Sequence, residues 1–107
     1  MKEIIKAEID KLLIETTRFD FPFFASIEKK KSIIAEKKLY IEKKMEVLAP
    51  QLLSDNERKE KIWEKSVEYA EEQFKTLPQN KRLNGFYLQE LMHYYTEQLG
   101  DNIMNND

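Results

Sequence analysis

The spacing of Glu90, His93 and Glu97 is the only pattern in this sequence that resembles a metal-binding motif. Glu-x-x-His on one helix is a quarter of a ferritin-like di-iron site. The second Glu-x-x-His motif is missing, because His93 is the only histidine in the chain. The three side chains also fall on the helical face opposite the apolar residues, so we expect them to face solvent and to bind no metal.

Other residue types exclude most enzyme chemistry. There is no cysteine, which excludes a thiol nucleophile, a thiolate metal site and a disulfide framework. The two glycines, Gly85 and Gly100, are spaced as helix punctuation and form no phosphate-binding loop. The many carboxylates fall on helical faces that we expect to be solvated, whereas a general acid needs a buried pocket. We therefore expect a non-enzymatic protein without a cofactor.

The charge is high but nearly balanced. The chain has 18 basic and 20 acidic residues, for a net charge of −2, which gives no reason to expect a polyanion partner. Residues 78–100 can be aligned with a helix-turn-helix unit that begins at Asn80, Lys81, Arg82 and Asn84. The helix that follows carries Glu90 and Glu97, which repel phosphates. A small DNA-binding or regulatory protein of a phage or mobile element is therefore the alternative, and nucleic acid is not the favoured partner.

Three lysines interrupt the apolar stripe of the longest predicted helix. Adjacent apolar pairs recur at 33/34, 40/41 and 47/48, and they straddle Lys30, Lys37 and Lys44. A buried ammonium group without a partner is costly, so something must compensate its charge.

Two interpretations of these lysines remain open. In the favoured one, residues 51–77 form an antiparallel hairpin with the lysine helix and place acidic side chains opposite it. Those side chains are Glu57, Glu60, Glu64 and Glu71. In the other, the lysines and Tyr40 form a basic, partly apolar face for an acidic partner protein.

Aromatic side chains gather where the first two helices join. Four phenylalanines fall within six residues around Pro22, and they are either a hydrophobic plug or an exposed anchor for a partner. Tyr87 and Tyr94 lie on the flank of the last predicted helix. The candidate partner-binding residues are Phe19, Phe21, Phe23, Phe24, Lys30, Lys37, Tyr40, Lys44, Tyr87 and Tyr94.

Helices must position all of these residues. The prolines Pro22, Pro50 and Pro78 divide the chain into four segments, since proline is tolerated in a first helical turn but not in a helix interior. Apolar residues at spacings of three and four predict helices over 2–17, 22–49, 54–76 and 84–100. Ile27 extends the apolar stripe of the second helix backward from the adjacent pairs. The stripe of the fourth helix is Leu88, Leu91, Met92, Tyr95 and Leu99.

Local signals suggest where these helices begin and end. Asp20 is the predicted N-cap of the second helix. Ser54 and Glu57 are spaced as a capping box for the third. Gly100 is a typical residue for the end of the fourth.

We therefore expect one all-α domain over residues 1–100, either a four-helix bundle or two packed helical hairpins, followed by a frayed tail at 101–107. The charged first residues and the lack of a long apolar run favour a cytoplasmic protein with no membrane partner. The Lys, Glu, Ile and Asn bias is typical of bacterial or phage proteins. The predicted function is a protein–protein interaction module of the inhibitor, immunity, adaptor or assembly-factor type, with a second copy as an alternative partner.

Overall fold

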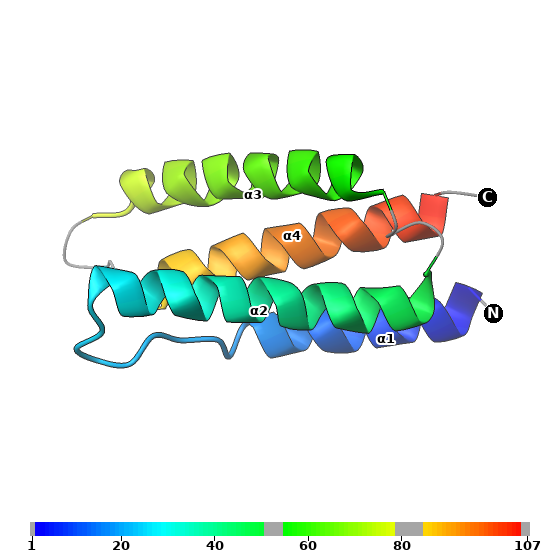
Figure 1. The fold of residues 1–107 in the computed structure, drawn as a ribbon, viewed down its shortest axis with the longest axis horizontal. Helices are drawn as coiled ribbons and strands as arrows, with labels where there is room; N and C mark the ends of the chain where they lie inside the picture. The colour runs from blue at the N-terminus through cyan, green and yellow to red at the C-terminus, as the bar shows by residue number, and fades with distance from the viewer. Residues whose placement is uncertain (1, 51–54, 79–84, 106–107) are drawn as a thin grey trace.

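The chain folds into four antiparallel helices. The structure is a computed structural model that describes residues 2–50, 55–78 and 85–105. The helices are α1 (Lys2–Thr16), α2 (Ile27–Leu48), α3 (Asn56–Thr76) and α4 (Phe86–Asn105), and the described residues contain no strand. Successive helices run in opposite directions in a bundle that measures 44 × 24 × 22 Å (Figure 1). The predicted all-α fold is confirmed as a helical bundle.

Helix α4 is the centre of the bundle. The backbones of the other three helices each come close to it, whereas those of α2 and α3, over their described residues, do not come close to each other. The cause lies in the sequence, because α4 carries apolar side chains over a wide arc of its surface. Its buried residues are Leu88, Leu91, Met92, Tyr95, Thr96, Leu99, Gly100 and Ile103, which include the whole apolar stripe predicted for this helix.

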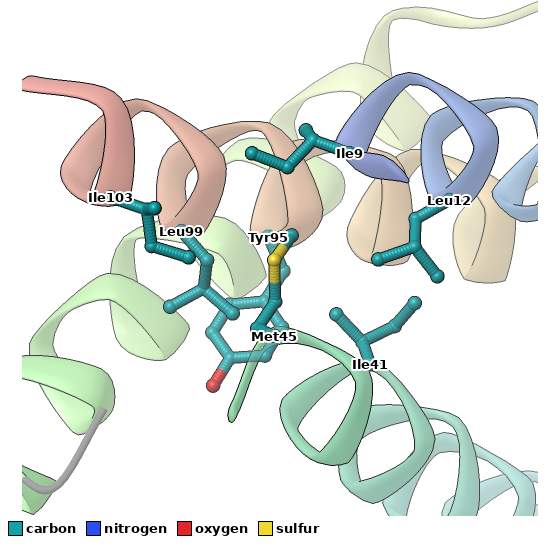
Figure 2. Close-up of a cluster of buried hydrophobic side chains, with 7 residues drawn as sticks. All are labelled: Ile9, Leu12, Ile41, Met45, Tyr95, Leu99 and Ile103. Atoms are coloured by element: carbon teal, nitrogen blue, oxygen red, sulfur yellow. The ribbon is translucent and has the colours of Figure 1, made fainter. Parts of the chain in front are cut away.

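Buried side chains form two clusters along α4. Figure 2 shows the first, where α1 and α2 meet α4 around Tyr95; its members are Ile9, Leu12, Ile41, Met45, Tyr95, Leu99 and Ile103. The second lies toward the start of α4 and contains Phe21, Ala70, Leu88, Leu91 and Met92. Burying one such aliphatic or aromatic side chain contributes about 1.5–3 kcal/mol, so these clusters hold the four helices together.

Gly100 does not end α4, and the predicted end is wrong. The helix continues to Asn105, and Ile103 is buried in the first cluster, so residues 101–105 of the predicted tail are helical. A Cβ atom at position 100 would lie 2.8 Å from Cγ2 of Ile9. The glycine is therefore needed for the close approach of α1 to α4, not for a turn.

Helix α2 begins later than the sequence predicts, at Ile27 instead of position 22. It is still the longest helix, with 22 residues. Its N-cap is Ser26, whose Oγ accepts a hydrogen bond from the backbone N–H of Lys29 at 3.1 Å. Asp20 caps no helix: its carboxylate accepts from the backbone N–H of Phe21 at 2.9 Å and lies against Gly85. The prediction fails because Ser26 provides a capping oxygen beside the first regular turn.

Helix α3 begins after Asp55, whose side chain accepts from the backbone N–H of Arg58 at 3.1 Å. The predicted capping residue, Ser54, lies outside the described residues. The predicted end at Thr76 is confirmed. Helix α4 starts after Gly85, which has a φ of +88°, a conformation that favours glycine.

Candidate functional site

The three lysines of the α2 stripe lie over aromatic rings, and the predicted pairing with α3 glutamates is wrong. The Nζ atom of Lys30 is 5.5 Å from the ring centre of Phe21. That of Lys37 is 4.8 Å from Phe19, and that of Lys44 is 5.6 Å from Tyr40. None of the three forms an ion pair with a described residue. Cation–π attraction and contact along the lysine stems therefore compensate for their position.

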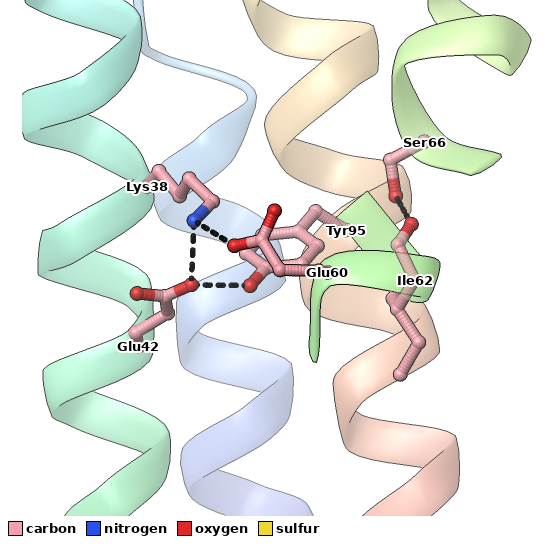
Figure 3. Close-up of polar contacts among 6 residues, drawn as sticks. All are labelled: Lys38, Glu42, Glu60, Ile62, Ser66 and Tyr95. Carbon is pink, nitrogen blue, oxygen red and sulfur yellow. Dashed lines mark hydrogen bonds and ion pairs between the residues drawn. The ribbon is translucent and has the colours of Figure 1, made fainter. Parts of the chain in front are cut away.

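A different lysine, Lys38, makes the connection to α3. Its Nζ lies 3.2 Å from Glu42 and 3.3 Å from Glu60 (Figure 3). The same atom is 5.2 Å from the ring centre of Trp63. The sequence prediction failed because it assumed that α2 and α3 pack directly. Since both pack on α4, the lysine that points between them is one position further along the chain than Lys37.

Tyr95 extends this contact into the core. The side chain is fully buried, and its hydroxyl donates a hydrogen bond of 2.5 Å to Oε2 of Glu42 (Figure 3). Burial raises the pKa of Tyr95, and the hydrogen bond to the Glu42 carboxylate raises it further. We call Lys38, Glu42, Glu60, Trp63 and Tyr95 the Lys38 network. All its charged groups have partners, so the network has the character of a structural link between α2, α3 and α4.

A groove between α1 and α2 brings several predicted residues together. It contains two hollows of about 300 and 220 Å³, and Glu15 lines both. Phe19, Lys37 and Tyr40 line the larger hollow, whereas Lys44 lines the smaller one. The other lining residues are Glu8, Lys11, Leu12, Arg18, Glu36, Val47 and Leu48. We call this feature the α1–α2 groove.

Hydrogen bonds and ion pairs already engage part of the groove. The Tyr40 hydroxyl donates to Oε2 of Glu15 at 2.6 Å, and this bond raises the pKa of Tyr40, with a smaller contribution from burial. Lys11 lies 3.1 Å from Glu8. The ring of Phe19 meets that of Tyr40 edge-on, with 6.5 Å between centres. These contacts fix the positions of Phe19 and Tyr40, the aromatic side chains that line the groove.

The phenylalanine cluster divides into an inner and an outer pair. Phe21 is buried in the core and Phe19 is half-buried, as expected for a hydrophobic plug. Phe23 and Phe24 are 81% and 92% exposed, and their rings pack edge-to-face at 4.5 Å, as expected for an exposed anchor. Ile27, predicted to belong to the core stripe, is 74% exposed. We call Phe23, Phe24 and Ile27 the aromatic tip.

Tyr87 and Tyr94 lie away from the groove. Tyr94 stacks on Tyr69 of α3 at 4.2 Å between ring centres, and Tyr87 meets Phe74 edge-on at 6.2 Å. Burial raises the pKa of Tyr87, and the charge of Glu71 adds to this effect. Both tyrosines thus stabilise the α3–α4 contact, and the structure does not bring them to the other candidate residues.

His93 is partly packed against α1, although the sequence predicted that it faces solvent. The Thr16 hydroxyl donates to the carbonyl of Leu13 at 2.7 Å and lies 3.0 Å from Nδ1 of His93. Its Nε2 is 3.9 Å from Glu97. Among residues 2–50, 55–78 and 85–105, no group of three His, Asp or Glu side chains is arranged to hold a metal ion.

Sequence reasoning missed a third hollow, of about 410 Å³, between α3 and α4. Arg58, Lys61, Lys65 and Asp101 line it together with uncharged polar side chains. The guanidinium of Arg58 donates to the side chain of Asn102 at 3.5 Å. This hollow is hard to predict from the sequence, because its position depends on which faces of α3 and α4 meet.

No protein-family model, curated protein or solved structure matches this chain. Within the described part of the chain, no helix combines the length and the apolar character needed to cross a membrane. The residues considered for DNA contacts, Asn80, Lys81, Arg82 and Asn84, lie outside the described residues.

Proposed function

We propose that this chain is a non-enzymatic interaction module that binds a partner protein through the aromatic tip and the α1–α2 groove. The observation that carries the proposal is the exposure of two adjacent phenylalanines, at 81% and 92%. A role as an inhibitor, immunity protein, adaptor or assembly factor is compatible with such a module.

The aromatic tip supports the proposal on energetic grounds. Burying a phenylalanine side chain stabilises a fold by about 1.5–3 kcal/mol. Phe23 and Phe24 are adjacent and exposed, so neither makes this contribution to the stability of the chain. Aromatic side chains that become buried in a partner's pocket are typical hot spots of protein–protein interfaces. Their edge-to-face contact at 4.5 Å keeps the two rings together before binding.

The groove supports it because it combines apolar and charged walls. Its apolar surface comes from Leu12, Leu48 and the rings of Phe19 and Tyr40. Its charged surface includes Lys37 and Lys44 on the α2 side. Interfaces of binding modules commonly have this composition, with an apolar centre and a polar rim.

The test is affinity capture from the organism that encodes the protein, followed by identification and reconstitution with the purified partner. The double variant Phe23→Ser/Phe24→Ser removes the tip, and Ile14→Ser is the matched control, because Ile14 is 57% exposed on α1 outside the groove lining. We expect the wild type and the control to bind the same purified protein. The tip variant should lose at least tenfold in affinity, about 1.4 kcal/mol.

Circular dichroism must show that the tip variant is folded. If this folded variant binds the partner as tightly as the wild type does, the proposed role of the tip is wrong. A partner that binds none of the three proteins once it is purified would contradict the module itself.

A further inference from the structure

The structure points to the kind of segment that the partner presents, an inference that rests on the function proposed above. We infer that this segment is an amphipathic helix with carboxylates at seven-residue intervals. It lies along α2 over Lys30, Lys37 and Lys44 and places apolar side chains in the hollows of the α1–α2 groove. Helix-in-groove binding of this kind is a recurring mode of peptide recognition.

Lys30, Lys37 and Lys44 are evenly spaced along α2, seven residues apart. Seven residues are about two helical turns, so the three ammonium groups form a row with intervals of roughly 10.5 Å. A partner helix that runs along α2 repeats with the same period, and carboxylates at every seventh position meet each lysine in turn. A partner strand or loop has no reason to match this period.

Aromatic rings orient these three lysines, but no carboxylate of the described residues pairs with them. Each lies over an aromatic ring, at 5.5, 4.8 and 5.6 Å from the ring centre. None of them forms an ion pair within the described residues. The rings restrict the lysine stems before binding, so less side-chain entropy is lost when a carboxylate arrives.

Two acidic residues of the groove already have partners within the chain. Glu8 is paired with Lys11, and Glu15 accepts the hydrogen bond of Tyr40. Lys37 and Lys44 have no such partner. The two hollows together are lined by four basic residues, Lys11, Arg18, Lys37 and Lys44, and three acidic ones, Glu8, Glu15 and Glu36, so the groove carries a small positive excess. This charge complements an acidic helix.

The chain's own α3 comes close to this description but lacks one requirement. Glu57, Glu64 and Glu71 are exposed and seven residues apart. However, the large hydrophobic side chains that are exposed in the described residues all belong to α1, α2 and the connection between them. Helix α3 of a second copy would therefore offer carboxylates but no apolar side chains for the hollows, so we assign the groove to a different protein.

The test uses a labelled synthetic peptide of about three heptads, with glutamate at every seventh position and leucines beside it. We expect fluorescence anisotropy to show saturable binding to the wild type at low salt. The triple variant Lys30→Gln/Lys37→Gln/Lys44→Gln should bind about tenfold more weakly, because three ion pairs with the peptide are lost. A peptide twin with glutamine in place of glutamate should show a similar loss on the wild type.

The matched control is the triple variant Lys29→Gln/Lys31→Gln/Lys43→Gln. It removes the same charge from exposed lysines of α2 that lie outside the groove and over no ring. We expect this control to bind the peptide within about twofold of the wild type. Equal weakening in the two triple variants would overturn the inference, since it would indicate nonspecific charge attraction.

Three further outcomes would also overturn it. One is a wild type that does not bind the acidic peptide. Another is self-association in sedimentation that only the Lys30/Lys37/Lys44 variant abolishes, which would assign the groove to a second copy. A third is tighter binding to vesicles of anionic phospholipid than to the peptide. If the aromatic tip still captures a purified partner in these cases, the proposed function stands and only the inferred partner segment is wrong.

Discussion

Two regions of α2 place lysines next to aromatic rings, and they differ in what else surrounds the ammonium group. In the Lys38 network, Lys38 lies over Trp63 and also contacts two carboxylates, with its side chain 22% exposed. In the α1–α2 groove, Lys37 lies over Phe19 at a similar distance but has no carboxylate partner in the described residues. The two lysines are neighbours in the chain, so the difference does not come from their type.

The difference indicates which surface is structural and which is available. The Lys38 network links three helices and satisfies its polar groups internally, down to the buried hydroxyl of Tyr95. The groove leaves Lys37 and Lys44 over aromatic rings and without an ion pair in the described residues. A region whose charges are paired contributes to stability, whereas a region whose charges are unpaired is better suited to binding.

The largest difference in stability between the two regions is expected for Tyr95→Ala compared with Tyr40→Ala. Tyr95 is fully buried in the first core cluster, so its removal should lower the free energy of unfolding by about 3–5 kcal/mol. Tyr40 is half-buried at the groove, and its removal should cost about 1 kcal/mol. Urea denaturation measures both. Equal losses would mean that the groove is as structural as the network.

The second test compares Lys38→Ala with Lys37→Ala. The first change leaves Glu42, whose side chain is 15% exposed, without its cation, and should cost about 1–2 kcal/mol. The second removes a cation–π contact of a half-buried lysine and should change stability by about 0.5 kcal/mol. Thermal unfolding of the two variants gives the comparison. A larger loss for Lys37→Ala would reverse the roles that we assign to the two regions.

The third test uses pH. The pKa of Tyr95 in the folded protein is raised above its ordinary value of 10.0. The folded state therefore holds the phenol proton more tightly than the unfolded chain does. The stability from this group is complete below pH 10 and is lost as the pH rises through the folded pKa. At about pH 11, the wild type should have lost about 1.4 kcal/mol more than Tyr95→Phe relative to neutral pH.

Denaturant midpoints measured for both proteins between neutral pH and about pH 11 isolate this group, because the other tyrosines and the lysines are common to both. Parallel loss of stability in the two proteins would contradict the pKa shift. It would also weaken the assignment of Tyr95 to a closed network.

The smallest expected effect on stability is that of Phe23→Ser/Phe24→Ser. Both side chains are at least 81% exposed and contact chiefly each other. Replacing them should change the unfolding free energy by less than about 0.5 kcal/mol. Calorimetry checks this value. A melting temperature lowered by several degrees would show that the tip supports the fold.

Much of the helical architecture follows from local patterns. The four helices, the end of α3 at Thr76 and the buried stripe of α4 agree with the sequence prediction. The errors lie where two local signals compete. Ser26 took the capping role assigned to Asp20, and Gly100 lies inside a helix because α1 requires space there. Neither result follows from the pattern of a single segment.

The candidate site was only partly predictable. Phe19, Lys37, Tyr40 and Lys44 do line one groove, whereas Tyr87 and Tyr94 pack against α3. The sequence placed Val47 in the apolar stripe, yet it is 82% exposed, and it overlooked Met45, which is fully buried. A wheel predicts which residues share a face, but it does not show how that face is rotated toward its neighbours.

The sequence by itself determined that Lys30, Lys37 and Lys44 share one face of a long helix and that their charges need compensation. That conclusion depends only on the period of the helix and on the cost of burying an ammonium group. The tertiary structure decided what compensates them, because the wide apolar surface of α4 draws α2 and α3 onto itself and not onto each other. Phenylalanine and tyrosine rings therefore lie beneath these lysines, and among the described lysines of α2 only Lys38 forms an ion pair with a glutamate of α3.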